Sequence, residues 1–407
     1  MSRSHILILS TAHLCRNPRV LKEATTLGHA GYDVTVLSVS IQSRFEEMDR
    51  ALMQNLPFKR VTLDYATGRT GTRLAHFAQR SITWLAGRLS HTFGVESSRS
   101  LGPAIALLRL ARAHPADLTI AHTEIPLWVA QQLHREGRRV AVDLEDWYSE
   151  DLLFSDRQSR PVRLLRNAEK FALQSAAYVS VPSQCMADRL FERHGGKRPV
   201  ILRNVFPLQP NPRQTVSRPR GRPRFIWFSQ TIGPGRGLEL FLAAWARTKQ
   251  PSEIHLLGDE RAGYREKLLS LLPPTRRADL HFIPLVPTDQ LSTKLAQYDL
   301  GLALEPHWPV NRDIAVTNKI MQYLNAGLAV VATDTAGQTE VMQAAPDAGI
   351  LVTAHETTEF AERLDGLLDD PERLARTQLA ARAAAEATFS WQREAPNLLA
   401  AVESALR

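Results

Sequence analysis

The chain alternates short apolar runs with amphipathic helical segments, and this alternation is the feature that most constrains its fold. The pattern opens with an apolar run at 5–10, a helical repeat over 18–30 and a second apolar run at 34–39. The same order recurs up to residue 202 and begins again at 225. Strands separated by helices pair in parallel and are covered by helices on both faces. The sequence therefore predicts an α/β protein with two doubly wound, Rossmann-like sheets in tandem.

The alternation stops once, between 206 and 223. This segment holds five prolines, four arginines and no acidic residue, which is typical of an interdomain linker. We therefore expect an N-terminal domain at 1–205, a linker at 206–223 and a C-terminal domain at 224–385. We expect the helical segment at 386–407 to cross back to the N-terminal domain.

Apolar runs and cysteines exclude several classes of protein. The longest apolar run near the start, Ile6 to Leu9, is far shorter than the roughly 20 residues of a spanning helix or the roughly 7–15 of a signal peptide. The two cysteines, Cys15 and Cys185, are too few for a disulfide framework or a thiolate metal cluster. We therefore expect a cytoplasmic protein.

The net charge of +8 lies in the first half of the chain, because residues 1–200 carry 27 basic and 19 acidic side chains and residues 201–407 carry 23 of each. Within the densest basic stretch, an apolar stripe at helical spacing runs through 73–93, with arginines elsewhere on the circumference. The stripe comprises Leu74, Phe77, Ala78, Ile82, Leu85 and Leu89, and the arginines are Arg73, Arg80 and Arg88. Two interpretations stay open: a helix packed on the domain's sheet, and a basic amphipathic helix resting on an anionic membrane.

A glycine-rich loop joins the first strand of the C-terminal domain to its first helix. It reads SQTIGPGRG over 229–237, and Arg236 stands at the start of the helix. Backbone N–H groups, the helix dipole and a guanidinium converge there, an arrangement that holds phosphate groups without a metal. The alternative is a glycine-rich turn with a solvated arginine.

A second polar segment, NKIMQYLNAG, occupies 318–327 and leads into an apolar strand. Asn318 and Gln322 stand four residues apart, so they share one helix face, with Lys319 beside them. Their amides suit hydroxyl groups of a ligand, and Lys319 adds positive charge. The alternative is a solvated polar face over an apolar core.

These two segments, their order and their separation resemble the family 4 glycosyltransferases of the GT-B type, and the resemblance covers most of the chain. Further matching blocks are NPRVLKE at 17–23, Ala121-His122, DLEDWYSE at 143–150, Arg203-Asn204, YDLGL at 298–302 and GQTE at 337–340. The resemblance implies the GT-B architecture, in which two Rossmann-like domains face each other across a cleft.

The resemblance also implies an activity. The enzyme would transfer a sugar from a nucleotide-diphosphate sugar on the C-terminal domain to a hydroxyl acceptor on the N-terminal domain, with retention of configuration. A UDP-sugar is the first candidate donor, and a glycan, a lipid-linked or a small-molecule acceptor receives the sugar. Because the chain has no Asp-x-Asp box and no His/carboxylate cluster in its sequence, we expect no metal.

The candidate site residues follow from the resemblance and, on the acceptor side, from positions just after predicted strands. Arg236 is expected to hold the donor diphosphate, Lys319 to supply a second positive charge, and His122 to face the transferred sugar; these three are the catalytic candidates. The donor-binding candidates are Gln230, Thr231, Gly235, Gly258, Val286, Asn318, Gln322 and Glu340. The acceptor-side candidates are Arg16, Asn17, Arg19, Glu124 and Asp146.

The sequence departs from the family's pattern at its paired glutamates. The first glutamate would fall at Ile314, and the second, which binds the donor ribose, at Gln322. Glutamine still hydrogen-bonds a hydroxyl but lacks the charge-assisted bond that a carboxylate makes. Asp313 and Glu305 are candidate substitutes for the missing carboxylates.

Three other functions stay open at this point. A GT-B epimerase or hydrolase would consume the donor without an acceptor, and a nonenzymatic nucleotide-sugar-binding protein would bind it without turnover. Nucleic-acid binding is suggested by charge alone and lacks a recognition motif, so we expect no nucleic-acid partner. The expected partners are a nucleotide sugar, a glycan or lipid-linked acceptor of polysaccharide biosynthesis, and the inner membrane face as a peripheral contact of the basic N-terminal domain.

Overall fold

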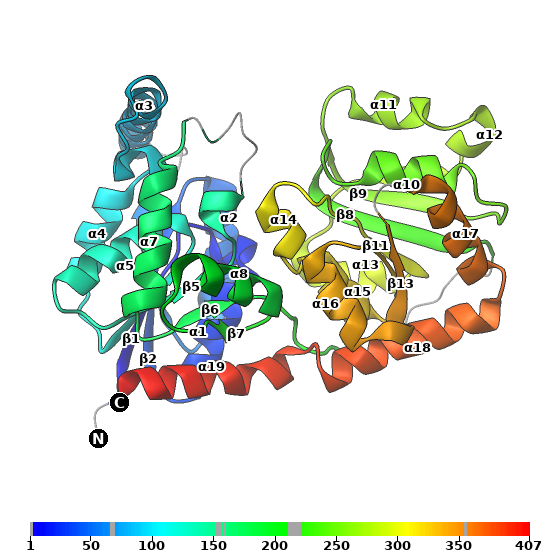
Figure 1. Ribbon diagram of the computed structural model, residues 1–407. Coiled ribbons are helices and arrows are strands. Elements are labelled where there is room, and N and C mark those ends of the chain that lie inside the picture. The colour runs from blue at the N-terminus through cyan, green and yellow to red at the C-terminus, as the bar shows by residue number, and fades with distance from the viewer. Residues whose placement is uncertain (1–2, 66–69, 152–156, 158, 211–220, 354–355) are drawn as a thin grey trace. The chain divides into compact units, whose positions relative to one another are not determined.

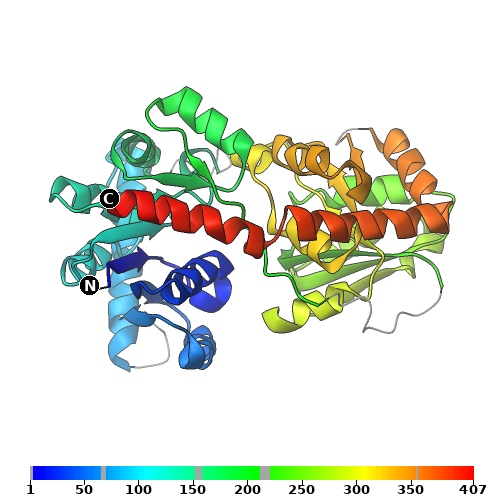
Figure 2. The same ribbon diagram turned by 90° about the horizontal axis from the view of Figure 1, so that it is seen from below.

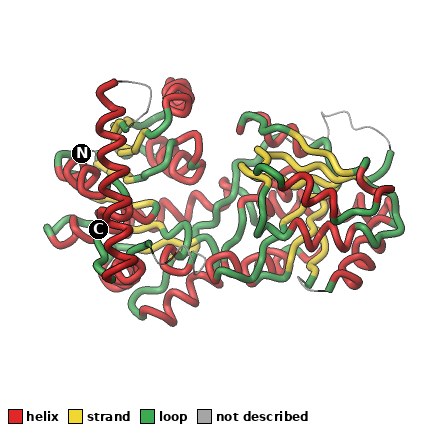
Figure 3. Tube along the Cα trace, turned by 90° about the horizontal axis from the view of Figure 1, so that it is seen from above, coloured by secondary structure: helices red, strands yellow, loops and turns green. Residues whose placement is uncertain are grey.

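The computed structural model describes residues 3–407 apart from 66–69, 152–156, 158, 211–220 and 354–355 (Figure 1). Contacts divide the chain into two compact units: Met1–Leu202 with Ala395–Arg407, and Arg203–Glu394. Most of the predicted linker lies outside the described residues. Each unit is a parallel sheet between helical layers (Figure 3), so the α/β fold with two doubly wound sheets is confirmed.

The N-terminal unit contains a seven-stranded sheet in the order β3-β2-β1-β4-β5-β6-β7, with all neighbouring strands parallel. Its strands are β1 (His5–Leu9), β2 (Asp33–Ser40), β3 (Lys59–Asp64), β4 (Leu118–His122), β5 (Val140–Asp143), β6 (Val179–Val181) and β7 (Val200–Ile201). Its helices include α1 (Pro18–His29), α2 (Ser43–Leu52), α3 (Thr70–Phe93), α4 (Ala104–Arg112), α5 (Glu124–Arg135), α7 (Val162–Ser175) and α8 (Gln184–His194). The strand order reverses between β1 and β4, and ligands of such sheets bind outside the carboxyl ends of the strands at this point.

The C-terminal unit contains a six-stranded sheet in the order β10-β9-β8-β11-β12-β13, also parallel throughout. Its strands are β8 (Arg224–Ile232), β9 (Glu253–Glu260), β10 (Leu280–Ile283), β11 (Leu300–Ala303), β12 (Ala329–Thr333) and β13 (Gly349–Val352). Its helices include α10 (Leu238–Trp245), α11 (Tyr264–Ser270), α12 (Pro274–Arg277), α13 (Thr288–Leu295), α14 (Val310–Ile314), α15 (Asn318–Ala326), α16 (Ala336–Ala344), α17 (Thr357–Leu368) and α18 (Pro371–Ala387). The reversal lies between β8 and β11, which places the ends of these two strands at the expected ligand edge.

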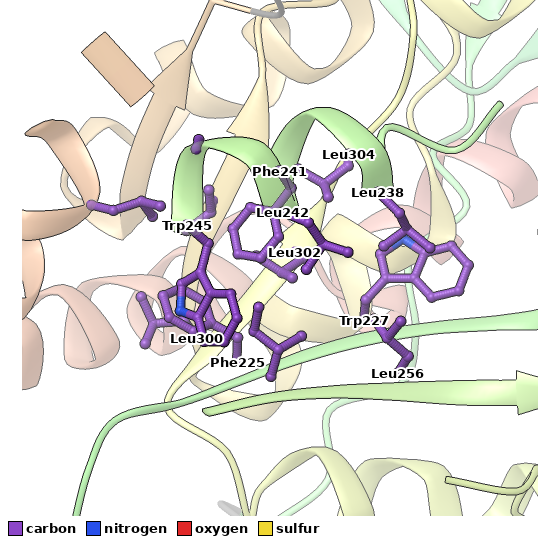
Figure 4. Close-up of a cluster of buried hydrophobic side chains, with 14 of the residues drawn as sticks. Phe225, Trp227, Leu238, Phe241, Leu242, Trp245, Leu256, Leu300, Leu302 and Leu304 are labelled. Atoms are coloured by element: carbon purple, nitrogen blue, oxygen red, sulfur yellow. The ribbon is translucent and has the colours of Figure 1, made fainter. Parts of the chain in front are cut away.

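The core of the C-terminal unit fixes α10 on the sheet (Figure 4). One face of this helix buries Leu238, Phe241, Leu242 and Trp245, positions that repeat at helical spacing. Phe241 meets Phe225 of β8 edge to face, with ring centres 5.5 Å apart. Because α10 is anchored in this way, the glycine-rich loop before it is held at the end of β8.

Several element boundaries differ from the sequence-based expectation. β8 continues to Ile232, four residues beyond the predicted strand end, with an irregular register between Phe228 and Thr231. Gln230 and Thr231 are therefore strand residues rather than loop residues. Strands β3 and β13 and the five-residue helix α14 are additions that the pattern did not indicate.

The exposure of helix α3 tests one of the two interpretations of the basic stretch. The apolar stripe points outward: Leu74 is 76% exposed, Phe77 71% and Leu85 55%. The small residues Ala86 and Ser90 are buried instead. The interpretation in which the stripe packs on the sheet is therefore wrong. Within the described chain, none of the helices combines the length and the apolar character needed to span a bilayer.

The last helix, α19 (Trp391–Leu406), begins in the second unit, where the Trp391 N–H donates to the Phe206 carbonyl at 3.0 Å. Its residues from Ala395 onward group with the first unit, where Leu398 and Val402 are fully buried. Figure 2 shows this end of α19, drawn in red, along the N-terminal unit. The closing segment of the chain therefore contributes to the core of the N-terminal unit.

Candidate functional site

Arg236 lies in the turn that connects β8 to α10. Gly235 and Gly237 on either side of it have φ angles of 72° and 74°, the left-handed region that favours glycine. A Cβ on Gly237 would also lie 2.9 Å from the Leu304 Cβ, so this position tolerates only glycine. In the part of the chain that the structure describes, the half-buried Arg236 makes no hydrogen bond or ion pair. An unpaired guanidinium at a helix N-terminus suits an anionic ligand.

Arg312 of α14 braces this turn from the neighbouring strand end. Its Nη1 donates to the Gly235 carbonyl at 2.7 Å and lies 3.9 Å from Glu305 Oε2. Sequence reasoning missed Arg312 because α14 is too short to show helical periodicity. The one signal in the sequence was that Arg312 is the only Lys or Arg between Lys294 and Lys319. Arg312 therefore fixes the loop that carries Arg236.

Lys319 is bound by a carboxylate of its own chain. Its Nζ lies 2.5 Å from Glu305 Oε1, and the two residues are only 8% and 4% exposed. Thr333 fixes Glu305, because its Oγ1 accepts from the Glu305 N–H at 2.9 Å and donates to the Glu305 carbonyl at 2.8 Å. Lys319 is therefore ion-paired with Glu305, and Glu305 is not a free substitute for the missing glutamate. That Lys319 supplies a second positive charge to the donor diphosphate stays a prediction.

His307 lies between two carboxylates in the segment after β11. Its Nδ1 is 2.7 Å from Asp313 Oδ1 and its Nε2 is 3.0 Å from Asp334 Oδ1. Partial burial of the ring lowers its pKa, but the bonds to the two aspartates outweigh this and raise the pKa above its ordinary value. Asp313 also accepts the Ala336 N–H at 3.2 Å. Asp313 and Glu305 were the candidate substitutes for the missing glutamates. Both carboxylates are already bound within the chain, Asp313 by His307 and Glu305 by Lys319.

The remaining donor-side candidates fall into two groups. Asn318, which is exposed, and Gln322, which is half-buried, lie on one face of α15, and neither side chain hydrogen-bonds another described residue. Their amides are therefore available to a ligand. Gly258 has a packing role instead, because a Cβ there would lie 2.5 Å from the Ser229 carbonyl oxygen.

Four further donor-side candidates occupy accessible positions around this edge. Gln230 and Thr231 are exposed on the extension of β8, Val286 is half-buried after β10, and Glu340 is half-buried on α16. Gln230 and Glu340 have partners within the chain. Their part in donor binding stays a prediction.

His122 ends β4 in the N-terminal unit and is fully buried. Its Nε2 lies 3.3 Å from Glu23 Oε2, and its Nδ1 lies 3.0 Å from Asp143 Oδ2 and 3.3 Å from Glu145 Oε1. Burial alone would lower the pKa of His122, but the surrounding carboxylates raise it well above its ordinary value. The ring is therefore enclosed by carboxylates of its own unit, and the expectation that His122 faces the transferred sugar is corrected.

Arg19 completes this buried cluster. Its guanidinium binds Asp143 through Nε and, at 2.6 Å, through Nη2, and its Nη1 donates to the Leu202 carbonyl at 2.7 Å. Since Arg19 is 1% exposed, the expectation that it binds an acceptor is corrected. Asn17 caps α1 by accepting the N–H groups of Arg19 and Val20, and it donates to Glu145 at 3.1 Å. Both residues hold the unit together.

The structure gathers one group of possible metal ligands at this cluster. Ligand atoms of Glu23, His122 and Asp143 lie within 4.8 Å of one another. Arg19 already neutralises Asp143, and Lys22 is buried beside it, which lowers the pKa of Lys22 to about 7. These two cations therefore balance part of the negative charge of the cluster. A second group, Glu253 with His255 and His281, lies near the amino ends of β9 and β10, away from the glycine-rich loop.

The other acceptor-side candidates lie near the surface. Arg16 is exposed, with its guanidinium carbon 4.7 Å from the centre of the Phe45 ring. Glu124 pairs with Arg160, and the half-buried Asp146 has a partner within the chain. An acceptor contact of these residues stays a prediction.

A cavity of about 450 Å³ opens at the carboxyl ends of β1 to β4. Its lining includes Thr11, Val39, Ile41, Tyr65, Trp84 and Ile125. The Thr11 hydroxyl lies 2.8 Å from that of Thr123, which has a φ of 70°. Sequence reasoning missed this largely apolar cavity because its walls come from strand ends and from α3, which lie far apart along the chain. Its place at the switch point makes it the candidate acceptor pocket.

Comparison with known proteins places these observations in a family. The family described as "Glycosyl transferase 4-like domain" matches residues 17–204, and that described as "Glycosyl transferases group 1" matches residues 222–370. The spore coat protein SA of Bacillus subtilis is 33% identical over 78 residues, which span 19% of this chain and only 21% of that protein.

Solved structures resemble the chain over its whole length. Sucrose-phosphate synthase from Thermosynechococcus elongatus has a TM-score of 0.70 at 14% identity and covers 98% of both chains. The Anabaena protein Alr3699/HepE, crystallised in complex with UDP and glucose, has a TM-score of 0.66 at 19% identity, covering 99% of this chain and 100% of that one. Two matching family domains and a GT-B fold along the entire chain lead to one conclusion: the chain is a GT-B glycosyltransferase of the family-4-like type.

Proposed function

We propose that the protein transfers a sugar from a UDP-sugar, bound by the C-terminal unit, to a hydroxyl of an acceptor bound by the N-terminal unit. The observation that carries the proposal is Arg236: an unpaired guanidinium, set between two left-handed glycines at the start of α10 and braced through Arg312. A diphosphate bound there would meet fixed positive charge without prior rearrangement.

The same geometry supports the chemistry of transfer. The bond from the anomeric carbon to the diphosphate oxygen breaks as the acceptor oxygen bonds to that carbon. Negative charge grows on the leaving diphosphate, and the Arg236 guanidinium with the N–H groups at the start of α10 would stabilise it. In the retaining course that the family resemblance implies, the acceptor proton passes to the departing diphosphate oxygen.

Uracil is the base that we assign to the donor nucleotide. The Anabaena protein of the same fold was crystallised with UDP, which supports this choice by analogy. The free amides of Asn318 and Gln322 suit the hydroxyls of the donor, and Val286 offers an apolar contact. These contacts do not require a metal ion, and we expect binding without one.

The acceptor that we assign is a glycan or a lipid-linked molecule of polysaccharide biosynthesis, received at the cytoplasmic face of the membrane. The largely apolar pocket of about 450 Å³ and the excess of basic over acidic side chains in the N-terminal half support this class. A small polar acceptor would leave much of that pocket lining uncovered.

Donor binding is tested by thermal shift with UDP, GDP and ADP. A ligand at 100 times its Kd stabilises the folded protein by about 2.7 kcal/mol. We expect UDP to raise the Tm of the wild-type protein and Arg236→Ala to abolish that rise. Arg247→Ala, which removes an exposed arginine near the other end of α10, should keep it. An equal UDP response in Arg236→Ala would remove Arg236 from the site.

Turnover separates the proposed transferase from the alternatives. UDP release from UDP-sugars should depend on an added acceptor and appear together with a glycosylated product. Release at the same rate without an acceptor would indicate a hydrolase or epimerase, and binding without release would indicate a nonenzymatic protein.

A further inference from the structure

Helix α3 lies at the edge of the N-terminal unit (Figure 1). It presents an uncovered apolar stripe to solvent. The exposed fractions reach 76% at Leu74, 71% at Phe77 and 62% at Trp84. Ile82, Leu85 and Leu89 of the same stripe are exposed too, and the exposed Trp84 and Phe93 extend the stripe defined from the sequence. Large apolar side chains gathered on one exposed face of a single helix mark a contact with a partner or a membrane.

The opposite face of α3 explains why the stripe is free. Ala86 and Ser90 are buried, and a Cβ on Gly87 would lie 3.3 Å from the Ser159 carbonyl oxygen. The helix therefore packs on the unit through small residues, against neighbours such as the short turn Ser98–Leu101. In an ordinary surface helix the apolar side faces inward. Here it faces outward, so core packing does not account for the stripe.

The charge of the segment around the stripe indicates which kind of partner the stripe contacts. From 65 to 95 the chain carries four arginines and no acidic residue. Arg88 lies over the Trp84 ring, 5.2 Å from its centre, which joins a cation to an amphipathic aromatic side chain on the exposed surface. Arginines flanking an apolar face, with tryptophan among them, characterise helices that lie in the plane of an anionic lipid surface.

We propose that the outward stripe of α3 docks this protein on an anionic lipid bilayer. The apolar side chains enter the boundary between headgroups and acyl chains, and the exposed Arg80 and Arg88 meet lipid phosphates. A second copy of the chain is a poorer occupant, because two such helices face to face would bring like charges together without an acidic partner in this stretch.

The location of α3 gives the docking a consequence for the proposed transfer. Trp84 belongs both to the stripe and to the lining of the pocket of about 450 Å³. The pocket therefore lies next to the surface that meets the lipid. This consequence rests on the proposed function, since it takes the pocket as the acceptor site, whereas the docking itself does not.

The experiment measures co-sedimentation of the full chain with vesicles of phosphatidylglycerol and phosphatidylcholine, and with vesicles of phosphatidylcholine alone. We expect binding to the anionic vesicles that weakens with added salt. The double variant Phe77→Ser/Leu85→Ser should lose about 100-fold in partition coefficient, because two large apolar side chains no longer enter the lipid. Arg88→Gln should lose about fivefold on anionic vesicles only.

A matched control is Leu379→Ser, which removes a leucine that is 69% exposed on α18 of the other unit and should leave vesicle binding unchanged. Equal binding of the double variant and the wild type, or no wild-type binding to anionic vesicles, would overturn the proposal. So would a wild-type dimer in sedimentation velocity that the double variant dissolves, because the stripe would then serve a second copy.

The UDP-induced rise in Tm is measured on the same preparations. An unchanged rise in the double variant shows that the fold and the donor site are intact. A wild-type protein that binds vesicles but ignores UDP would refute the proposed function and leave the docking in place.

Discussion

A substitution of Gln322 tests the proposed contact between the C-terminal unit and the donor ribose. It stands where the family resemblance places a ribose-binding glutamate, and its amide is free in the structure. Gln322→Glu should lower the Kd for UDP about fivefold, since a charge-assisted hydrogen bond is worth about 1 kcal/mol more than a neutral one. Isothermal titration calorimetry measures the change.

The control for this prediction is a second ligand rather than a second variant. 2′,3′-Dideoxy-UDP offers no ribose hydroxyls, so it should bind the wild type and Gln322→Glu equally. A gain that persists with the dideoxy ligand, or weaker binding of UDP, would show that Gln322 does not contact the ribose.

The surroundings of a residue could be predicted where they lie within one short segment. They could not be predicted where an interaction partner comes from a distant part of the chain. The turn around Arg236 could be predicted because glycines and a cation lie within one short segment. The neutralisation of Lys319 by Glu305 could not, because the two residues are 14 apart and belong to different elements. The ion pairs of His307 with Asp313 and Asp334 could not be predicted either, because they join residues from separate segments.

The ion pair between Glu305 and Lys319 links the end of β11 to α15, and a prediction at the scale of elements follows. Glu305→Gln leaves the Lys319 ammonium buried without a countercharge, which should destabilise the C-terminal unit by about 3–5 kcal/mol. The double variant Glu305→Gln/Lys319→Met removes the stranded charge and should recover most of that loss. Urea unfolding followed by hydrogen exchange of the α15 amides measures both.

Equal losses in the single and the double variant would contradict this reading. They would show that the carboxylate acts through Arg312 or the fixed backbone at Thr333 rather than through Lys319. Asp188→Asn is a suitable comparison, because it breaks an exposed pair with Arg198 in the other unit and should cost less than about 1 kcal/mol.

Helix α3 shows what periodicity can and cannot establish about an element. Spacing at 3.6 residues predicted an amphipathic helix correctly. It did not indicate which side faces the unit, because that depends on which face has small residues that allow close approach. Strand β3 was missed for another reason: its inner residues are only half-buried and stand between the exposed charged residues Lys59 and Asp64, so the segment has no continuous apolar run.

At the scale of the whole chain, the order of elements could be predicted and their assembly could not. Alternating strands and helices determine a parallel, doubly wound sheet, and both sheets follow this rule. The buried cluster of Arg19, Glu23, His122 and Asp143 brings together α1, β4 and β5, so its members are up to 124 residues apart. Arg19 and His122 were predicted to contact ligands, but both are buried and paired with Asp143 instead.

The same cluster predicts how the stability of the N-terminal unit depends on pH. Burial raises the pKa of Asp143, but Arg19 and His122 outweigh it and hold the pKa well below its ordinary value of 3.8. Below pH 3.8 the unfolded chain therefore binds a proton that folded Asp143 resists. The stabilisation is present above this pH and is lost as the pH falls.

Above neutral pH, two groups change the stability of the N-terminal unit in opposite directions. The pKa of His122 is raised in the folded unit, so its contribution is complete below 6.5 and is lost as the pH rises through its folded value. Burial lowers the pKa of Lys22 from 10.5 to about 7, so the cost of its buried charge is relieved over that range. We expect these two trends to offset each other above neutral pH.

The N-terminal unit should therefore lose stability steeply between pH 4 and pH 2, and only weakly between pH 7 and pH 9. Urea midpoints measured by hydrogen exchange of β4 and β5 amides give the profile.

Asp143→Asn should be less stable by about 3–5 kcal/mol at pH 7, because Arg19 and His122 lose their shared carboxylate. It should also show a flatter acid limb, whereas Asp188→Asn, at an exposed pair, should keep the wild-type slope. If Asp143→Asn retained the full acid slope, the acid sensitivity of this unit would have to arise from carboxylates outside the buried cluster, such as Asp49, whose pKa is also lowered in the folded chain.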